Sequence, residues 1–525
     1  MKRKPIKTVF CLALTALISS GGIVGAAAVE ENGGETALPS SYSSRDIGYV
    51  TSVKYQDYSS CWAFAAMATL ESFLLRNGEN ISDMSTNHLN MWATPRESGN
   101  GWQRSVASDG YPNIALGYMT SWQGGVLQSD LGDYPLSDEI TGDMVPVDLA
   151  RYGITSVRYL QKGDFEDIKR AVMDNGGVYT SYAHSASCLN KERTAYYMPE
   201  SYSGGYSGHS IEVVGWDDNY PRESFENETG KLPVGNGAWL IKNSWGNNNA
   251  LGGYFWASYE DKYLFSNKYN PSYALQSYEK LDGKVKLIQN EIYGATYEFK
   301  YVEAPVLTYI NRLHFDGDFN VIDKVVFKTD AVGADYTIWY VPDGTGEAPD
   351  NDVSHWTRLY DGAVDYKGYI CADIEDFAYP DSTGSIAVTV DATDSDGKSS
   401  LGVGEWLTNS SDYVFKNESA KGESYLKNGD DMQDLMDWYL ENEDDPIGGT
   451  FVIKAVTKQY YPATLLGDVN QDGVVNIRDV TEIQRHVAEY ITLEKTALAN
   501  ADINGDGIIT IEDGTLLQMK LALLI

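Results

Sequence analysis

The C-terminal part of the chain contains an internal duplication. Two segments, DVNQDGVVNIRD at 468–479 and DINGDGIITIED at 502–513, share one pattern and begin 34 residues apart. Both have acidic or amide side chains at positions 1, 3, 5 and 12, and both have glycine at position 6. Helical patterns follow the two segments, at 480–490 and 514–524. We therefore expect the C-terminus to fold as two copies of one loop–helix unit.

The side chains of these two segments suit calcium. Oxygen ligands at positions 1, 3, 5 and 12, with a glycine for the tight turn, form the pattern of an EF-hand loop, here with aspartate in place of glutamate at position 12. Two acidic turns without metal would not require this spacing. We expect two calcium ions, one in each loop. The expected ligands are Asp468, Asn470, Asp472, Asp479 and the carbonyl of Val474, then Asp502, Asn504, Asp506, Asp513 and the carbonyl of Ile508.

A cysteine at the start of a helical run is the second informative feature. Residues 61–76, CWAFAAMATLESFLLR, contain many good helix formers, Ser59 or Ser60 can act as the N-cap, and Asn77-Gly78 supplies a stop signal. A thiol at a helix N-terminus lies at the positive end of the helix dipole, which stabilises its thiolate. Cys61 is therefore a candidate nucleophile. A buried structural cysteine is the alternative, and the more common one for an isolated Cys.

A nucleophilic cysteine needs a base and a group that orients the base. Of six histidines, His209 stands out because GGYSGHSIEVVGW places it after a glycine-rich turn, at the start of an apolar strand. His184 is a weaker candidate. In AWLIKNSWG, Asn243 ends a strand next to Trp245, so its carbonyl can accept from the imidazole while the indole shields that bond. Each signal is weak alone, but the order Cys, His, Asn is specific.

These segments together resemble the papain family of cysteine peptidases. The resemblance covers about residues 38–260 and rests on VKYQ at 53–56, CWAF at 61–64, GH at 208–209 and KNSWG at 242–246. It implies a two-lobed fold with the cleft between a helical lobe and a β-rich lobe. It also implies that Cys61 is the nucleophile, that His209 is the base and acid, and that Asn243 orients His209. Gln56 would donate to the oxyanion together with the backbone N–H of Cys61. Gln56 lies one residue closer to Cys61 than is usual in the family.

The duplicated loop–helix unit resembles the dockerin module of cellulosomal enzymes. The resemblance implies calcium-dependent folding and docking to a cohesin domain of a scaffold protein. Ile477-Arg478 and Ile511-Glu512 occupy the positions that this family uses to choose its partner. A period of 34 residues also fits tetratricopeptide repeats, but the ion-loop residues and the presence of only two copies argue against them.

The middle of the chain, 269–458, alternates strand patterns with Gly, Asp and Pro, for example at 324–328, 336–341, 368–374, 385–390 and 450–456. We expect a β-sandwich or jelly roll. It resembles the lectin-like β-domain of some bacterial secreted peptidases. Carbohydrate is a candidate ligand because Trp339, Trp356 and Trp406 could stack on sugars, although core packing is the commoner role of tryptophan.

The N-terminus has the pattern of a secretory signal: basic residues, an apolar core at 9–18, and AAA at 26–28. We expect cleavage after Ala28, with Ala26 as the alternative position. We also expect no pro-segment, no membrane span, and a secreted protein held at the cell surface through a scaffold. The net charge of −35 disfavours nucleic acid as a partner. Without the signal, three cysteines remain, Cys61, Cys188 and Cys371, so at least one is unpaired within the chain.

The sequence thus predicts a multidomain α+β protein. Its expected parts are a signal peptide at 1–28, a polar segment at 29–37, a papain-like peptidase at 38–268, a lectin-like β-domain at 269–458, a linker at 459–466 and a dockerin-like module at 467–525. The expected function is that of a secreted cysteine endopeptidase. The alternatives are an inactive papain-like binding module, and an inhibitor or acyl transferase built on the same residues.

Overall fold

The protein is described from a computed structural model. It describes residues 37–98, 101–132, 140–266, 271–300, 304–315, 317, 319, 321–344, 348–379, 383–395, 398–404, 421–442, 449–459, 465–493 and 495–522. The predicted signal peptide at 1–28 and Trp406 lie outside the described residues. Within the described residues, no helix has the length and apolar character that crossing a membrane requires.

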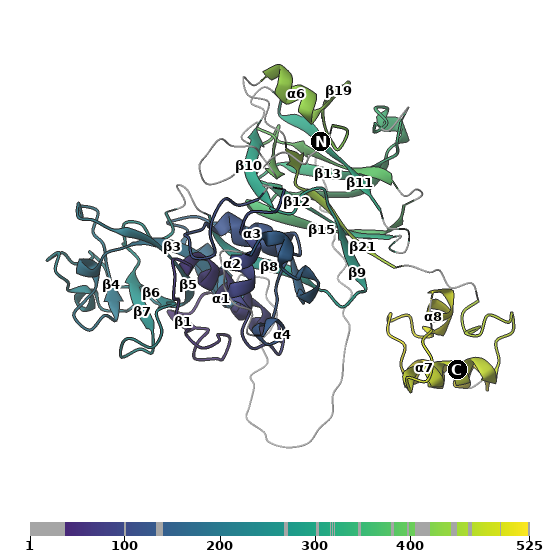
Figure 1. The fold of residues 1–525 in the computed structure, drawn as a ribbon, viewed down its shortest axis with the longest axis horizontal. Coiled ribbons are helices and arrows are strands. Elements are labelled where there is room, and N and C mark those ends of the chain that lie inside the picture. The colour runs from purple at the N-terminus through teal and green to yellow at the C-terminus, as the bar shows by residue number, and fades with distance from the viewer. Residues whose placement is uncertain are drawn as a thin grey trace. The chain divides into compact units, whose positions relative to one another are not determined.

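The first lobe is helical and is organised around α1 (Cys61–Arg76), which packs against the strand β5 (Ser207–Asp217) (Figure 1). Around it lie α2 (Thr86–Trp92), α3 (Pro112–Thr120) and α4 (Gln128–Leu131), followed by the short 3-10 turns Gly142–Met144 and Val147–Leu149. Most of α1 is buried, which explains why its apolar residues do not form a single stripe. As predicted, the helix begins after Ser60 and ends at Asn77-Gly78.

The second lobe is β-rich. Its strands are β1 (Ser41–Ser43), β2 (Tyr152–Leu160), β3 (Val178–His184), β4 (Ala195–Tyr196), β5 (Ser207–Asp217), β6 (Ala238–Lys242), β7 (Tyr254–Ser258) and β8 (Ser272–Lys280). The short 3-10 turns Ala186–Cys188 and Arg222–Phe225 also belong to this lobe. The helix α5 (Phe165–Asn175) buries Ile168, Ala171 and Val172, whereas Phe165 is 39% exposed. The apolar strand expected from His209 is β5, and the strand expected to end at Asn243 is β6.

One sheet continues from this lobe into the β-rich domain. Its order is β4-β7-β6-β5-β3-β8-β2-β15-β12-β21-β9, with β1 paired to β5. The last four strands are β15 (Gly368–Ala378), β12 (Val321–Thr329), β21 (Ile453–Lys458) and β9 (Val285–Ile288). The connection is short, because β2 pairs with β15 only at Arg158–Gly368 and Val157–Tyr369. Close by, the buried Lys454 ammonium lies 2.6 Å from the Glu291 carboxylate and donates to Ser121 Oγ at 2.7 Å.

The predicted domain boundary at residue 268 lies directly before β8. In the sheet, β8 lies between β3 and β2, which are both strands of the peptidase lobe.

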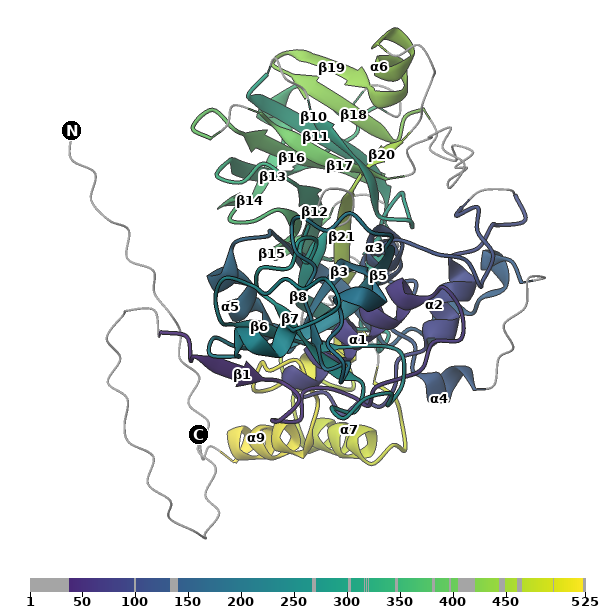
Figure 2. The ribbon, with the colours of Figure 1, turned by 90° about the vertical axis from the view of Figure 1, so that its left-hand side faces the viewer.

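The β-rich domain is a sandwich, as predicted (Figure 2). One layer is formed by β9 (Val285–Ile288), β12 (Val321–Thr329), β15 (Gly368–Ala378) and β21 (Ile453–Lys458). The other layer is a six-stranded sheet, ordered β14-β13-β16-β11-β18-β19: Thr357–Ala363, Asp335–Val341, Thr383–Asp391, Val306–His314, Ser424–Asn428 and Asp431–Asp434. The three-stranded sheet β10-β17-β20 (Ala295–Lys300, Ser400–Gly404, Thr450–Phe451), the 3-10 turn Val353–His355 and α6 (Leu435–Asn442) complete it. Apolar side chains of the two layers share one core, which includes Val325, Phe327, Ile338 and Val388.

The C-terminal module contains α7 (Ile477–Val487), α8 (Lys495–Ala501) and α9 (Ile511–Leu521). The helices α7 and α9 pack on a small core that includes Val480, Ile483 and Leu517. Both helices begin three residues earlier than the predicted runs. The reason is that Asp479 and Asp513, at loop position 12, are also the N3 residues of capping boxes with Asn476 and Thr510. Loop and helix therefore overlap.

Candidate active site

Cys61 is the first residue of α1, and its thiol lies against Ser210 of β5. Burial raises the pKa of the Cys61 thiol, and the Asp109 carboxylate raises it further, whereas the backbone N–H and the hydroxyl of Ser210 lower it. The N–H of Trp62 also lowers the pKa, as expected at the N-terminus of a helix. In the described structure no hydrogen bond joins the thiol to His209, which is the residue before Ser210. The thiol must therefore turn from Ser210 to meet the imidazole.

His209 and Asn243 are brought together by neighbouring strands. β5 carries His209, β6 ends one residue before Asn243, and the two strands are antiparallel neighbours. His209 Nε2 lies 2.8 Å from Asn243 Oδ1, which also accepts a bond from the Ser244 N–H at 2.8 Å. Because Oδ1 accepts from a backbone N–H, the amide orientation is set and Nε2 must be the imidazole donor. The lone pair of the neutral ring is then on Nδ1.

Trp245 covers this pair. Its indole stacks on the imidazole of His209 with 4.5 Å between ring centroids and 25° between planes. His209 is buried, and burial lowers its pKa to about 4, while the bond to Asn243 acts in the opposite direction and His184 lowers the pKa slightly further. Burial thus disfavours the charged forms of both the thiol and the imidazole. A proton transfer between them creates two opposite charges side by side, which offsets part of that cost.

His184, the weaker candidate, lies on β3 beside this group. It contacts Trp245 edge-on, with ring centroids 4.8 Å apart, and its centroid is 6.4 Å from that of His209. Its Nδ1 lies 3.0 Å from the hydroxyl of Tyr182, and burial lowers its pKa. The structure therefore places His184 next to the His209–Trp245 pair, and it is His209 that bonds Asn243.

Gln56 is held close to the site by the residue after Asn243. The Gln56 backbone N–H donates to the Ser244 carbonyl at 2.8 Å, and Ser244 Oγ donates to Gln56 Oε1 at 2.6 Å. Gln56 Nε2 donates to the Tyr58 carbonyl at 2.9 Å. A primary amide nitrogen carries two hydrogens, so one N–H of Gln56 is taken up by the shortened 56–61 segment and one is left for a ligand.

A buried network of charges below the site was missed by sequence reasoning. Lys242, the last residue of β6, lies 3.6 Å from the Glu212 carboxylate and 4.0 Å from that of Glu71, and both glutamates are completely buried. Glu71 also bonds the Lys54 ammonium and the Met84 N–H. The network joins α1 to β5, which carries His209, and to β6, which ends directly before Asn243. Charged residues within the apolar runs of α1, β5 and β6 were the available signal.

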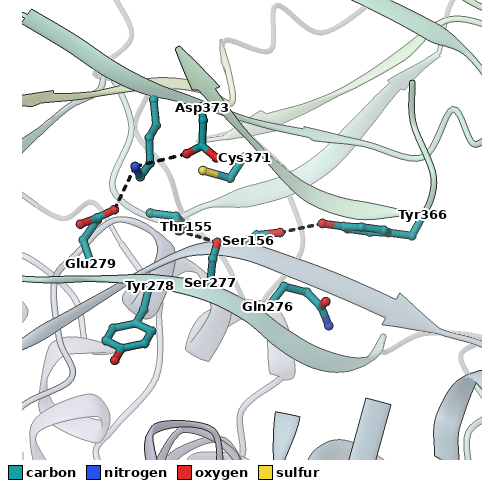
Figure 3. A pocket seen from close by; sticks show the side chains of 10 residues that line it. Thr155, Ser156, Gln276, Ser277, Tyr278, Glu279, Tyr366, Cys371 and Asp373 are labelled. Carbon is teal, nitrogen blue, oxygen red and sulfur yellow. Dashed lines mark hydrogen bonds and ion pairs between the residues drawn. The ribbon is translucent and has the colours of Figure 1, made fainter. Parts of the chain in front are cut away.

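The structure gives the other two cysteines a different setting, and it describes all three as unpaired. Cys188 is buried, and burial raises its pKa. Cys371 lies on β15 and lines a polar cavity of about 300 Å³ between β2, β8, β12 and β15 (Figure 3). In that cavity Lys324 lies between Glu279, at 3.5 Å, and Asp373, at 3.2 Å. Burial and the Asp373 carboxylate raise the pKa of Cys371 to about 12.

The two C-terminal loops have the same hydrogen-bond pattern. Asp468 accepts from the N–H of Gly473, and Asp502 accepts from the N–H of Gly507, each at 2.9 Å. The position-12 carboxylates, Asp479 and Asp513, are fully buried. In the described part of the chain, no three His, Cys, Asp or Glu side chains converge closely enough to hold a metal alone. Each loop supplies carboxylate, amide and carbonyl oxygens instead, and this all-oxygen donor set fits calcium.

Comparison with known proteins agrees with these observations. The profile for papain family cysteine proteases matches residues 38–274, and that for the dockerin type I domain matches residues 466–522. Cathepsin S of Mus musculus is 31% identical over 221 residues, which are 41% of this chain and 58% of the cathepsin. The chain thus spans less than two thirds of that relative's length.

Two solved structures match both the peptidase lobes and the β-rich domain. A structure of the clostridial cysteine protease Cwp84 after propeptide cleavage is 33% identical, with a TM-score of 0.69, and covers 80% of this chain and 99% of its own. A second contains the cysteine protease and lectin-like domains of Cwp84, a surface-layer-associated protein of Clostridium difficile. It is 32% identical, with a TM-score of 0.69, and covers 81% of this chain and 90% of its own.

The chain belongs to the papain family of cysteine proteases. It combines a papain-like peptidase fold with a β-rich domain like that of Cwp84 and a C-terminal dockerin type I domain.

Proposed function

We propose that this protein is a cysteine endopeptidase that hydrolyses peptide bonds with Cys61, His209 and Asn243. The observation that carries the proposal is the His209–Asn243 hydrogen bond of 2.8 Å, which Trp245 covers. His209 lies on β5, the strand whose Ser210 contacts the Cys61 thiol. The hydrogen bond leaves Nδ1 of the imidazole as a base next to a thiol at a helix N-terminus. This arrangement supports nucleophilic catalysis.

The reaction begins when His209 Nδ1 accepts the proton of the Cys61 thiol. The thiolate attacks the carbonyl carbon of the substrate, a C–S bond forms, and the negative charge moves to the carbonyl oxygen. The N–H of Cys61 and the second N–H of Gln56 stabilise that charge. The C–N bond breaks as His209 returns its proton to the leaving amine. His209 then takes a proton from water, whose oxygen attacks the thioester carbonyl carbon and forms a C–O bond. The C–S bond breaks, the acid leaves, and the Cys61 sulfur takes the proton back from His209.

Hydrolysis of an unfolded protein by wild type and by Cys61→Ala tests this function. We expect mass spectrometry to find internal cleavages with the wild type and none with Cys61→Ala. The alternative, a papain-like module that only binds proteins or glycans, predicts that neither protein cleaves the substrate and that both bind it equally. Calcium should be present throughout, so that the C-terminal module stays folded.

The C-terminal module would anchor the peptidase. We propose that each loop binds one calcium ion through the residues predicted above, and that the folded module docks on a cohesin domain of a scaffold outside the cell. The support comes from the buried carboxylates of Asp479 and Asp513 and from two exposed apolar side chains, Ile477 at 59% and Ile511 at 57%. Isothermal titration should give two calcium ions for the wild type and one for Asp513→Ala. Retention of two ions by that variant would contradict the assignment.

The β-rich domain carries one candidate carbohydrate site. Two of the tryptophans singled out in the sequence, Trp339 and Trp356, meet with ring centroids 6.1 Å apart and line a cavity of about 250 Å³ with Thr308, Thr389 and Lys427. An aromatic surface beside hydroxyl and ammonium groups suits a sugar ring. We propose binding of a saccharide there. A glycan array probed with wild type and Trp339→Ala tests it, because identical binding by both proteins would exclude this cavity.

A further inference from the structure

Lys427 of β18 is a buried cation that lines the cavity of Trp339 and Trp356. The residue is only 6% exposed. Its ammonium donates to two oxygens of Asn351, the backbone carbonyl at 3.3 Å and the side-chain Oδ1 at 2.5 Å. The amide nitrogen of Asn351 donates to the Asp430 carbonyl at 3.1 Å, which directs Oδ1 toward the lysine. An ammonium carries three hydrogens, so one N–H of Lys427 is left for a ligand.

The charge of Lys427 has no carboxylate partner at contact distance. Both oxygens that the ammonium bonds are neutral, and within the described residues Lys427 forms no ion pair. The acidic residues on either side of Asn351 have other partners: Asp350 lies 2.6 Å from an imidazole nitrogen, and Asp352 accepts a backbone N–H at 3.0 Å. A buried charge is costly unless an opposite charge compensates it. A ligand with a negative charge would supply that compensation.

The other groups of the cavity add a second donor and apolar surface. Neither indole N–H is available to a ligand, because Trp339 donates to Thr389 Oγ1 at 3.1 Å and Trp356 donates to a backbone carbonyl at 2.7 Å. The hydroxyls of Thr308 and Thr389 share one hydrogen bond of 2.8 Å, which uses one of their two hydrogens. None of the described residues that line the cavity is acidic, in a chain with 75 Asp and Glu. The cavity thus combines two donors, one positive charge and aromatic surface.

We propose that this cavity binds an acidic saccharide, a sugar unit that carries a carboxylate. The inference rests on the saccharide site proposed above for the β-rich domain, and it names the class of sugar. The carboxylate pairs with the Lys427 ammonium, and a ring hydroxyl accepts the remaining hydrogen of the threonine pair. The sugar ring lies against the indoles of Trp339 and Trp356. The volume of about 250 Å³ is below the roughly 300–1,000 Å³ of drug-sized sites, so it suits one sugar unit.

Binding of matched sugars to the full chain tests this choice. The probes are glycans in a neutral form and in a uronic acid form, which differ only in a hydroxymethyl group or a carboxylate at C6, together with the methyl esters of the acids. An array identifies the glycans that bind, and titration with calcium present gives their affinities. For wild type we expect the uronic acid forms to bind at least about 10-fold more tightly than the neutral forms and the esters, because hydrogen bonds between charged groups are strong.

Variants of the cavity sharpen the test. Lys427→Gln should bind all forms weakly and alike, whereas Lys427→Arg keeps the charge and should retain part of the preference. Thr308→Val should weaken binding of every form by a smaller factor, about 2- to 10-fold. The control variant is Lys421→Gln, which removes an exposed lysine outside the cavity, paired with Asp437, and it should bind as wild type does. Circular dichroism shows which variants are folded, and the comparison of probes on wild type needs no variant.

The inference is overturned if wild type binds the neutral and uronic acid forms equally, or if a folded Lys427→Gln keeps the preference. It is also overturned if a glutamate peptide displaces the bound glycan as effectively as the free uronic acid form does, because the cavity would then recognise charge alone. If wild type binds no glycan, or if Trp339→Ala binds every glycan as wild type does, the saccharide site itself is wrong and this inference fails with it.

Discussion

Cys61 and Cys371 are both partly exposed thiols, and burial raises the pKa of each, yet their surroundings differ. Cys61 begins a helix and contacts the strand that carries a buried imidazole, and backbone N–H groups oppose the rise in its pKa. Cys371 lies within a strand, next to Asp373, in a cavity where Lys324 already has three carboxylate partners. Exposure alone therefore does not define a nucleophile; a group that takes the proton and donors that hold the thiolate do.

Removing the two sulfurs in turn gives the largest expected contrast. Cys61→Ala should lower kcat/KM for peptide hydrolysis by on the order of 10⁵-fold, because the covalent intermediate cannot form. Cys371→Ala should leave it unchanged within about 2-fold, as a thiol that stays protonated takes no part. Steady-state kinetics on one peptide measures both. Loss of activity in Cys371→Ala, with an unchanged circular dichroism spectrum, would contradict the claim that Cys371 takes no part in hydrolysis.

The charges beneath the two thiols also differ. Lys242 is almost fully buried between Glu71 and Glu212, so Lys242→Met should cost about 3–5 kcal/mol of unfolding free energy by leaving two buried carboxylates uncompensated. Lys324, near Cys371, is 23% exposed, so the matched Lys324→Met should cost about 1 kcal/mol or less. Urea unfolding with calcium present checks both. Equal losses of unfolding free energy in the two variants would contradict this difference, because they would mean that Lys242 is no better shielded from water than Lys324.

Acid should affect the Cys61 region through His209. Its pKa is lowered to about 4, below the value of 6.5 for an unfolded chain, so the unfolded state binds more protons between these limits. Stability is fully present above about pH 6.5 and is lost as the pH falls towards 4, by up to about 3 kcal/mol. The variant His209→Gln should lack this contribution to the pH dependence of the unfolding free energy. A further loss of stability over the same pH range should remain, because burial also lowers the pKa of His88 to about 4. An unchanged pH dependence in His209→Gln would contradict the buried, neutral imidazole.

Loss of the hydrogen bond that His209 donates to Asn243 should have a smaller effect on the rate. Asn243→Ala should lower kcat by about 100-fold with little change in KM, because the imidazole loses the acceptor that sets its tautomer. Asn249→Ala, in the loop after Trp245, is a matched control and should retain most of the activity. A rise in KM alone would mean that Asn243 holds the substrate and not His209.

Local signals predicted much of this structure. The limits of α1, the strand at 238–242 and the order of Cys61, His209 and Asn243 could be read from sequence, because each depends on a helix cap, a periodicity or a short motif. The starts of α7 and α9 were wrong by three residues because Asp479 and Asp513 serve both loop and helix. The assignment of roles to Gln56 and to the triad stays a prediction.

Features that depend on distant residues could not be predicted. Nothing local shows that Glu71, Glu212 and Lys242 meet, since they belong to one helix and two strands. The pairing of β2 with β15 rests on two residue pairs, each formed by residues more than 200 positions apart in the chain. It joins strands of the peptidase lobe and of the β-rich domain into one sheet. The polar cavity between β2, β8, β12 and β15 has no sequence signal either (Figure 3). There the hydroxyl groups of Ser156 and Tyr366 are hydrogen-bonded at 2.7 Å.

The central claim is that Cys61 alone among the three described thiols is activated. Titration with an epoxide inactivator near pH 6, read by peptide mass spectrometry with calcium present, tests it most directly. We predict one equivalent of label on Cys61, none on Cys188 or Cys371, and no label on Cys61→Ala. A folded protein that takes up no label, or takes it up on Cys371 at the same rate, would contradict the account.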